Sequence, residues 1–513
     1  MPIGDTEPPP PSGFPLRRAD RVALWSLIGL TLLTRVLAAT IWSADAETDP
    51  DAYVGIAKTM AIAGEFCVPG TNTPTAYRPP LYPYVLAVPL LDDPEKPLAD
   101  GISNFNTIFA VLLCVVTMGF AALLQSRIGL LVAAAIVALD PLLIRATPLA
   151  MTEPLFTLLT TYAVWMLVAS ETVWSSPFTG ERFPPAPSPP SSGERVGVRG
   201  RALVSASENS ADHEHRSERS TPSPYPSPPK TGERGPEGNV ILGRVLLPHT
   251  RLLVGIAAGI FLGLAALCRP TIWPFIGLYS LGLIAAQRRH LRDIILPLAT
   301  MWLVIAAVVS PWVIRNQLVM GHPILTTTHG GYTLLLGNNP VFYDEVARQP
   351  WGTVWDGGSL DRWQRGMLAE MDADLGPTAD EVARDRWQAA RAWRHITDDP
   401  AGFGWAVWYR VRSLWSLSPR GKGGESLPGV VRWLVAAWYA ALFGFAIAGA
   451  VIWWRERRPG LWVLLLFIAS VQMMHLVYWT DTRMRAPLHP VLAVLAATAV
   501  ERWWRWRGTR EAA

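Results

Sequence analysis

The chain alternates between long apolar runs and short polar loops over most of its length. Such runs predict transmembrane helices, because crossing a bilayer takes about 20 consecutive apolar residues. They lie at 22–43, 103–125, 128–149, 151–170, 250–268, 271–287, 293–313, 430–454, 459–479 and 486–503. The pattern therefore predicts an all-α integral membrane protein with about ten transmembrane helices.

Arginine residues are concentrated in alternate loops of this series. They are Arg17, Arg18, Arg21, Arg127, Arg288, Arg289, Arg292, Arg455, Arg457, Arg458, Arg502, Arg505, Arg507 and Arg510. The positive-inside rule places these loops and both termini in the cytoplasm. A small-residue stretch ending at Ala46 also suits signal-peptide cleavage, but the run at 22–43 is long for a signal peptide. We expect a multi-pass protein of the bacterial plasma membrane, with the other loops facing outward.

Two segments depart from the apolar pattern. Residues 171–248 are rich in Pro, Ser, Gly, Arg and Glu, and PSPPSSGER recurs there as PSPPKTGER, which predicts a disordered cytoplasmic insertion. Residues 314–429 predict a folded outer segment, in which a capping box of Thr378 with Glu381 opens an amphipathic helix. The Trp and Tyr residues of 401–417 suit a helix in the outer interface. The other divisions are the tails 1–21 and 504–513, the helical blocks 22–170, 249–313 and 430–503, and a first outer loop at 44–102.

Composition narrows the classes of partner. The chain has 513 residues, 50% of them hydrophobic, with a net charge of +4. Its Arg residues are scattered between apolar runs and form no basic face, which argues against nucleic acid as a partner. The three cysteines, Cys67, Cys114 and Cys268, are too few for a disulfide framework and have no metal-ligand spacing; a bridge from Cys67 to Cys268 is the alternative.

Unusual polar motifs gather in the predicted outer loops. The first is ETDPDAYVGIAKTMAIAGEF at 47–66, which follows the first apolar run directly. The others are AYRPPLYPYVLA, MTEPLF, CRPT, SPWVIRN and TDTRMRAPLHP, and together they supply Asp49, Asp51, Glu153, Arg78, Arg269, Arg315, Arg483 and Arg485. Acids and guanidinium groups in one outward-facing cavity would suit a substrate with a phosphate and a hydroxyl nucleophile.

In this order, the motifs resemble those of the integral-membrane glycosyltransferases of the GT-C superfamily. The closest family includes protein O-mannosyltransferases, aminoarabinose transferases of lipid A and Rgt-type lipopolysaccharide glycosyltransferases. The marks are Asp49 and Tyr53 running into IAKTMAIAGEF, the element AYRPPLYP, and PWVIRNQLVMGHPILTTTHGGYTLLLGNNP; the resemblance covers most of the chain except 171–248. It implies transfer of a sugar from a polyprenyl-phosphate carrier to a lipid, glycan or protein acceptor on the outer face of the membrane.

The resemblance also implies roles for three acids. Asp49 matches the family's catalytic aspartate and is the expected base; its alternative role is to cap the following helix. Asp51 either acts in the site or is a solvated loop acid. Glu153 matches the second outer acid, which orients the acceptor or helps to hold a divalent cation, or else it simply interacts with a helix dipole. A divalent metal ion is left open, with Asp49 and Glu153 as its candidate ligands.

Arg78 resembles a ligand of the carrier phosphate, since the guanidinium fork suits phosphate geometry; contact with lipid headgroups is the alternative. The complete set of expected substrate-binding residues is Tyr53, Arg78, Tyr82, Arg269, Arg315, Asn316, Arg483 and Arg485. Asp140 and Arg145 lie inside the third apolar run, where charge is unusual, and we expect them to pair with each other.

Other function classes remain as alternatives. A transporter should show ionisable residues near the midplane of several spans, often in repeated halves, whereas the polarity here lies mostly at the predicted outer ends. A membrane scaffold would not need the acid and Arg motifs. Among enzymes, the alternative is transfer of a whole oligosaccharide from a pyrophosphate carrier, a class that usually has a larger outer domain than 314–429.

Overall fold

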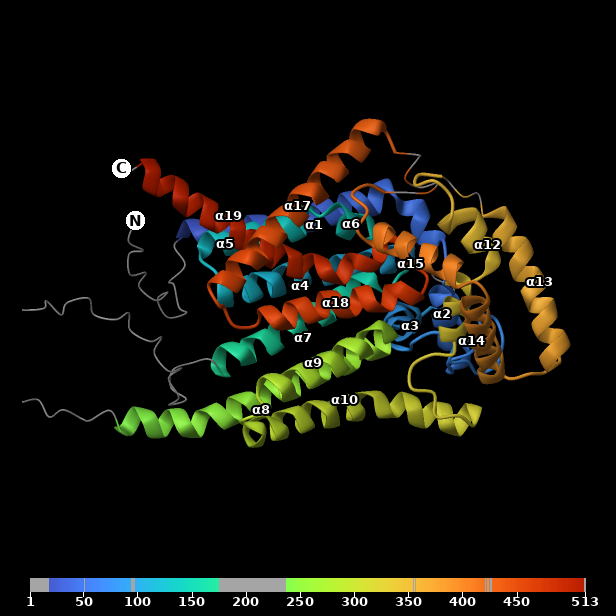
Figure 1. Cartoon of the computed structure of the whole chain (residues 1–513). Helices are drawn as coiled ribbons and strands as arrows, with labels where there is room; N and C mark the ends of the chain where they lie inside the picture. The colour runs from blue at the N-terminus through green and yellow to red at the C-terminus, as the bar shows by residue number, and fades with distance from the viewer. Residues whose placement is uncertain are drawn as a thin grey trace, which may run out of the picture. The chain divides into compact units, whose positions relative to one another are not determined.

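The computed structural model describes residues 18–49, 51–93, 97–174, 237–353, 355, 357–419, 421, 424 and 427–511 (Figure 1). Residues Met1–Trp174 and Pro248–Ala513 form one compact unit, to which the account below is confined. The predicted insertion at 171–248 falls largely outside the described residues. Within the described ranges the structure is helical and contains no β-strand, only an isolated bridge between Cys67 and Pro74. The all-α prediction is confirmed.

Each predicted apolar span except 128–149 coincides with one main helix. The main helices are α1 (Arg18–Ile41), α4 (Ala99–Leu124), α5 (Arg127–Leu139), α7 (Glu153–Trp174), α8 (Glu237–Cys268), α9 (Trp273–Ala286), α10 (Leu291–Met320), α17 (Gly429–Arg455), α18 (Leu461–Val477) and α19 (His489–Glu511). Among the described residues, six helices are long and apolar enough to cross a membrane: α1, α4, α7, α8, α10 and α17. The shorter α5, α9 and α18 are also apolar. The chain is thus a multi-pass membrane protein.

The predicted single span at 128–149 is wrong. Helix α5 ends at Leu139, and a second short helix, α6 (Pro141–Arg145), follows it. Asp140 has an extended backbone, and its carboxylate accepts hydrogen bonds from the N–H groups of Leu142 and Leu143. The break has a local cause: Pro141 suits the first position of a new helix but lacks the N–H group that would continue α5, and Asp140 caps that new helix.

The expected pairing of Asp140 with Arg145 is also wrong. Arg145 lies 2.6 Å from Asp45, which is in the 3-10 helix η1 (Ser43–Glu47) after α1. Asp140 lies 2.8 Å from His489 at the start of α19. Asp140 caps the start of the short α6 helix and Arg145 is its last residue, so each finds its partner in a different segment of the chain.

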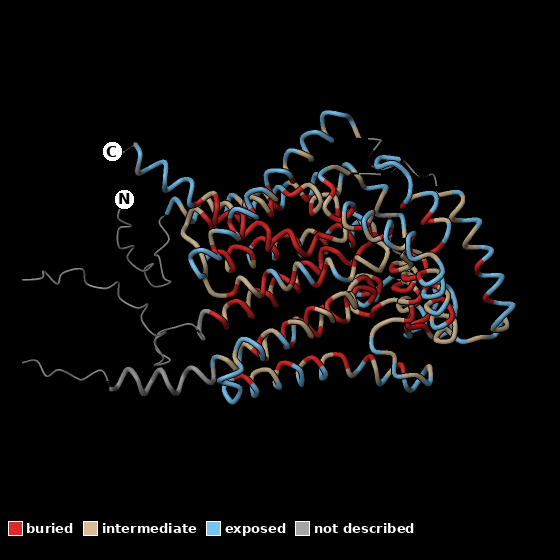
Figure 2. Tube along the Cα trace, in the orientation of Figure 1, coloured by how far each residue is buried: buried red, intermediate tan, exposed pale blue. Residues whose placement is uncertain are grey.

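Close helix packing depends on glycine at two contacts. On α8, Gly255, Gly259 and Gly263 face α10 at four-residue spacing, and a Cβ atom at Gly255 would lie 2.7 Å from the Pro297 carbonyl oxygen. A Cβ atom at Gly449 of α17 would clash with the backbone of Leu495 in α19. Such small residues let helix backbones approach closely where van der Waals contact drives association in a membrane. Figure 2 shows the resulting buried positions concentrated in α4, α5, α7 and α19.

Shorter helices gather at one end of these long helices (Figure 1). They are α2 (Tyr53–Ala63), α3 (Leu81–Ala87), α11 (Gly330–Gly337), α12 (Pro340–Phe342), α13 (Gly358–Leu375), α14 (Glu381–Asp398) and α15 (Pro400–Leu414). Helix α10 runs on to Met320, so the first residues of the predicted outer segment 314–429 continue the preceding span.

The predicted capping box of Thr378 with Glu381 is wrong. Helix α14 begins at Glu381, and its N-cap is Asp380, whose carboxylate accepts from the Ala383 N–H group at 2.7 Å. Glu381 instead accepts from the Thr75 hydroxyl at 2.5 Å and from the Ala76 N–H group at 2.9 Å. The acid therefore fixes α14 to the loop before α3, a long-range contact that helix-start patterns do not contain.

Candidate functional site

Charged residues from five segments meet where the short helices adjoin the long ones. We call this group the ionic cluster, and it consists of Asp51, Arg78, Glu153, Arg269, Asp481 and Arg483. Each member lies at or near the start of a helical element: α2, α3, α7, the 3-10 helix η4 (Pro270–Ile272) or the 3-10 helix η6 (Thr482–Leu488). The positive ends of helix dipoles favour carboxylates at such positions.

Arg78 is held by the loop that precedes α2. Its Nε donates to the Asp51 carbonyl oxygen at 2.7 Å, and its Nη2 donates to Asp51 Oδ1 at 2.9 Å. The guanidinium also lies 5.3 Å from the ring centre of Tyr53 and 4.9 Å from that of Tyr77. Two hydrogen bonds and two aromatic faces fix the orientation of Arg78.

Glu153 and Arg483 join the cluster together. Glu153 is buried, and its Oε1 lies 3.2 Å from Arg269 Nη1 and 3.8 Å from Arg483 Nε. Arg483 also lies 3.7 Å from an Asp481 carboxylate oxygen and 4.0 Å from one of Asp51. Burial lowers the pKa of Arg483, but the carboxylates of Glu153, Asp481 and Asp51 outweigh it and raise that pKa above its ordinary value. Arg483 therefore stays cationic at the centre of the cluster.

The cluster contains three carboxylates and three guanidinium groups, but these side chains differ in their exposure and in the length of their contacts. The side chains of Arg483 and Asp51 are 30% and 28% exposed, whereas Glu153 is only 5% exposed. Arg483 Nη1 donates to Met151 Sδ, but the contacts of Arg483 with carboxylates at 3.7–4.0 Å are longer than hydrogen bonds, so its Nε and Nη2 groups keep donor capacity. Such a partly exposed cation can accept an anionic ligand without first breaking a tight ion pair.

Asp49 lies beside this cluster and caps α2. Its carboxylate accepts from the Val54 N–H group at 3.1 Å and from the Gly55 N–H group at 2.7 Å. Among the described residues it forms no ion pair. Asp49 therefore does cap the helix, which is the alternative to its catalytic role. Each carboxylate oxygen still has a second lone pair, so Asp49 can accept a further hydrogen bond or a proton. Both backbone bonds also fix the direction in which this acid points.

Tyr53 and Tyr82 pack edge to face behind Arg78, with ring centres 5.3 Å apart. Burial raises the pKa of Tyr53 to about 12, which keeps its hydroxyl protonated at neutral pH. Tyr82 is fully buried. Of the two predicted ligand residues, only Tyr53 touches a member of the ionic cluster, since its ring is the one beneath the Arg78 guanidinium.

Two predicted substrate-binding residues at the end of α10 lie outside the ionic cluster. Arg315 donates to the carbonyl oxygens of Thr75 at 2.8 Å and Phe66 at 2.6 Å. Asn316 is fully buried and donates to the Ile324 carbonyl oxygen at 3.0 Å. Both side chains connect α10 to neighbouring loops, which gives each of them a structural task.

Arg485 belongs to a different group, which we call the interior cluster: Asp140, Tyr439, Arg485 and His489. All four are at most 2% exposed. Arg485 Nε donates to His489 Nε2 at 3.2 Å, and His489 Nδ1 lies 2.8 Å from Asp140 Oδ2. The Tyr439 hydroxyl donates to Asp140 Oδ1 at 3.2 Å. The sequence placed Arg485 with Arg483 because they share one motif, but η6 directs them into separate surroundings.

The ligand set suggested for a divalent cation does not fit one. The Asp49 carboxylate accepts one backbone N–H group on each oxygen, and Glu153 is paired with Arg269, so neither acid can give both oxygens fully to a cation. In the described part of the chain, no group of three or more His, Cys, Asp or Glu side chains is arranged to hold a metal ion. Arg269 and Arg483, which lie 3.2 Å and 3.8 Å from Glu153, would repel a cation at that acid.

No protein-family model matches the sequence, and no curated protein matches it either. Several solved structures match it, among them the following three. The archaeal oligosaccharyltransferase AglB from Archaeoglobus fulgidus, in complex with an inhibitory peptide and a dolichol-phosphate, matches with a TM-score of 0.50 and 14% identity over 97% of this chain and 52% of that one. The apo form of the Archaeoglobus fulgidus oligosaccharyltransferase gives 0.47 and 12% over 96% and 52%. ArnT from Cupriavidus metallidurans bound to undecaprenyl phosphate gives 0.35 and 14% over 92% and 78%.

The similarity to AglB, with a TM-score of 0.50 and 14% identity, shows a shared fold and no more. This shared fold agrees with the GT-C-like architecture that the sequence motifs led us to expect. The chain spans about half the length of the archaeal enzymes it matches.

Proposed function

We propose that the protein transfers a sugar from a polyprenyl-phosphate carrier to an acceptor hydroxyl. The ionic cluster carries this proposal, since it gathers Arg78, Arg269 and Arg483 from segments far apart in the sequence, and Asp49 lies two residues before its member Asp51. Guanidinium groups suit phosphate oxygens, and a carboxylate suits proton transfer from a hydroxyl. The AglB structure with the TM-score of 0.50 contains dolichol-phosphate, a carrier of the proposed class.

The reaction follows from these groups. The acceptor oxygen attacks the anomeric carbon of the donor sugar while the bond from that carbon to the phosphate oxygen breaks. The acceptor proton passes to Asp49, whose carboxylate is oriented by the N–H groups of Val54 and Gly55. The carrier phosphate leaves with the bonding electrons, and the added negative charge is stabilised by Arg483 and Arg78.

The other acids of the cluster act on the guanidinium groups. Asp51 binds Arg78 through both its backbone and its side chain, and Glu153 holds Arg269. A buried cation without a partner is costly, so these acids keep the phosphate site stable before the donor arrives. Asp51 and Glu153 are thus positioning residues in this mechanism, with Asp49 as the base.

The proposal includes an orientation, with the ionic cluster on the outer face of a bacterial plasma membrane. The Arg-rich loops on the opposite side support it through the positive-inside rule. An exposed residue of α15, Ala401, should label as Ala401→Cys with an impermeant thiol reagent added to intact cells, whereas Arg289→Cys should not. The native cysteines are all buried, so their background labelling should be low. The reverse labelling pattern would place the cluster inside the cell.

The test of function uses purified protein in nanodiscs with a panel of polyprenyl-phosphate sugars, and follows release of the carrier by mass spectrometry. Asp49→Asn should lower turnover by about 10²- to 10⁴-fold with donor binding retained, because Asn cannot take up the proton. Asp51→Asn should cost less, since it removes only one partner of Arg78. Normal turnover in Asp49→Asn with loss in Asp51→Asn would transfer the base role to Asp51.

A second candidate, transfer of a whole oligosaccharide from a pyrophosphate carrier, is favoured by the fold shared with the archaeal oligosaccharyltransferase. The same assay separates the two, because monophosphate and pyrophosphate donors release carriers of different mass. Release from pyrophosphate donors alone would favour this candidate. Release from neither class would contradict glycosyl transfer.

A further inference from the structure

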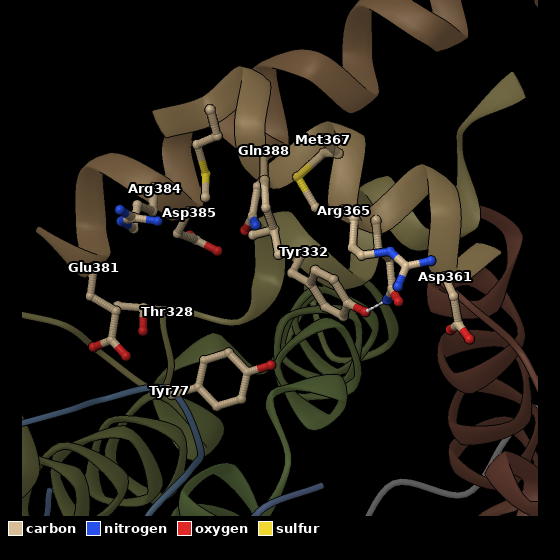
Figure 3. Close-up of a pocket in the computed structure, with 13 residues that line it drawn as sticks. Tyr77, Thr328, Tyr332, Asp361, Arg365, Met367, Glu381, Arg384, Asp385 and Gln388 are labelled. Carbon is tan, nitrogen blue, oxygen red and sulfur yellow. Dashed lines mark hydrogen bonds between the residues drawn. The ribbon is translucent and has the colours of Figure 1, made fainter. Parts of the chain in front are cut away.

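A cavity of about 580 Å³ lies beside the ionic cluster, between α13, α14 and the segments that contain Tyr77 and Tyr332. Figure 3 shows that the side chains around it come from these separate elements. None of them belongs to the six long apolar helices. The mechanism above leaves this cavity without a role.

Two buried polar side chains that line the cavity have no hydrogen-bond partner in the described part of the chain. Thr328 is 6% exposed, and its hydroxyl has no hydrogen-bond partner among the described residues. Gln388 is 8% exposed, and no hydrogen bond to its amide occurs within the described chain. Buried polar groups are nearly always paired, because leaving one unpaired costs about 1–3 kcal/mol. A hydroxyl and an amide of this kind are suited to hydrogen bonds with a ligand.

The remaining lining is aromatic and apolar. The His329 ring contacts Tyr77 edge to face and Tyr332 at a tilt, with ring centres 4.3 Å and 5.0 Å away, and so connects the two tyrosine rings. Met367 and Leu368 of α13 add apolar surface. Burial raises the pKa of Tyr77 to about 12, so its hydroxyl remains both a donor and an acceptor. Ring faces combined with hydroxyl and amide groups match the apolar faces and hydroxyl groups of a sugar.

The charged residues of the lining argue against an anionic ligand. Glu381 is bound by Thr75 and Ala76, Asp385 accepts from the Gly331 N–H group, and Arg384 is paired with Asp372. Asp361 and Arg365 remain, one of each sign, and they add no net charge. A neutral, polyhydroxylated ligand is therefore favoured over a phosphate.

We propose that the cavity between α13 and α14 binds a sugar residue of the acceptor, so that the acceptor is a glycan or glycolipid. Tyr77 lines the cavity and is adjacent to Arg78, whose guanidinium lies 4.9 Å from its ring centre. A sugar bound here lies next to the proposed carrier-phosphate site. The assignment of this sugar to the acceptor rests on the proposed function.

The test measures binding of the full-length protein in nanodiscs to an array of bacterial cell-surface glycans. The wild type should bind a subset of them, and Gln388→Leu should weaken that binding at least tenfold. Gln317→Leu, the same change at an exposed residue of α10, is the matched control and should bind like the wild type. Thr328→Val, which keeps the side-chain shape, decides the result if Gln388→Leu does not fold. Absence of glycan binding by the wild type, or unchanged binding by folded Gln388→Leu and Thr328→Val, overturns the proposal.

The carrier-release assay separates failure of this inference from failure of the proposed function. Glycan binding that depends on Gln388, without release of any carrier, would leave the sugar site intact and contradict glycosyl transfer. Carrier release with an unchanged acceptor KM in Gln388→Leu and Thr328→Val would support glycosyl transfer and exclude the cavity as the acceptor site.

Discussion

The ionic cluster and the interior cluster each contain an arginine from η6, only two residues apart, yet the two surroundings differ in kind. Arg483 is 30% exposed and lies 3.7–4.0 Å from three carboxylates. Arg485 is fully buried and donates to the carbonyl oxygens of Leu414 at 2.9 Å and Ser416 at 2.5 Å. The long, accessible contacts of Arg483 leave N–H groups that can donate to a ligand. The short hydrogen bonds from Arg485 to backbone carbonyl oxygens instead stabilise the fold.

The interior cluster also has a consequence for the site. Through Arg485 and His489 it connects η6 to the end of α15 and to the junction of α5 with α6. These contacts hold the backbone of η6, which in turn sets where Arg483 lies. The buried interior cluster thus positions the more accessible ionic cluster. Substitutions in the interior cluster should therefore change stability, and substitutions in the ionic cluster should change the reaction rate.

The largest effect should come from Arg485→Met. The change keeps much of the side-chain volume but leaves the Leu414 and Ser416 carbonyl oxygens and His489 Nε2 without their donor. Removing one member of a buried charged group typically costs about 3–5 kcal/mol. We expect a large fall in the thermal midpoint of the detergent-purified protein and a low yield of monodisperse material. A stable Arg485→Met protein with weakened donor binding would instead place Arg485 in the substrate site.

A smaller and different effect is expected for Arg483→Gln. Loss of one preorganised donor to a developing oxyanion typically costs about 10²-fold in rate, so carrier release should slow by this order. The thermal midpoint should stay close to that of the wild type, because the contacts that are lost are long and partly exposed. Arg483→Lys should recover part of the rate through its charge.

Arg432→Gln supplies the control for Arg483→Gln, since Arg432 is an exposed arginine at the start of α17. It should leave carrier release unchanged. Equal effects of the two substitutions would show that Arg483 acts by contact with lipid headgroups. The ionic cluster and the interior cluster would then not differ in their role in the reaction.

Hydropathy predicted the helices well because membrane spans are encoded locally. Its failure at 128–149 also had a local cause, since Asp140 and Pro141 end one helix and begin another. The ion pairs could not be predicted in this way. Arg145 pairs with Asp45, and Asp140 pairs with His489. The members of each pair come together only through the packing of whole helices.

The same limit applies to the site. The acids and arginines of the loops were identifiable from charge at predicted helix ends, and the structure brings Asp51, Arg78, Glu153, Arg269 and Arg483 together. Asp481 was missed, although it lies in the same motif as Arg483. The cavity between α13 and α14 gave no sequence signal, because its lining combines residues from segments whose proximity exists only after folding.

The smallest effects should come from a matched pair of hydroxyl deletions, Tyr439→Phe and Tyr53→Phe. The Tyr439 hydroxyl donates to Asp140 at 3.2 Å and accepts from the Leu142 N–H group at 3.0 Å, so its loss should lower stability by about 1 kcal/mol and leave turnover unchanged. The Tyr53 hydroxyl has no hydrogen bond among the described residues, and Phe keeps the ring beneath Arg78. Tyr53→Phe should therefore leave the thermal midpoint unchanged, but a lost hydrogen bond to donor or acceptor should reduce kcat/KM by up to about tenfold. Thermal unfolding and carrier release measured on both variants test the contrast, which fails if the two substitutions change the same quantity.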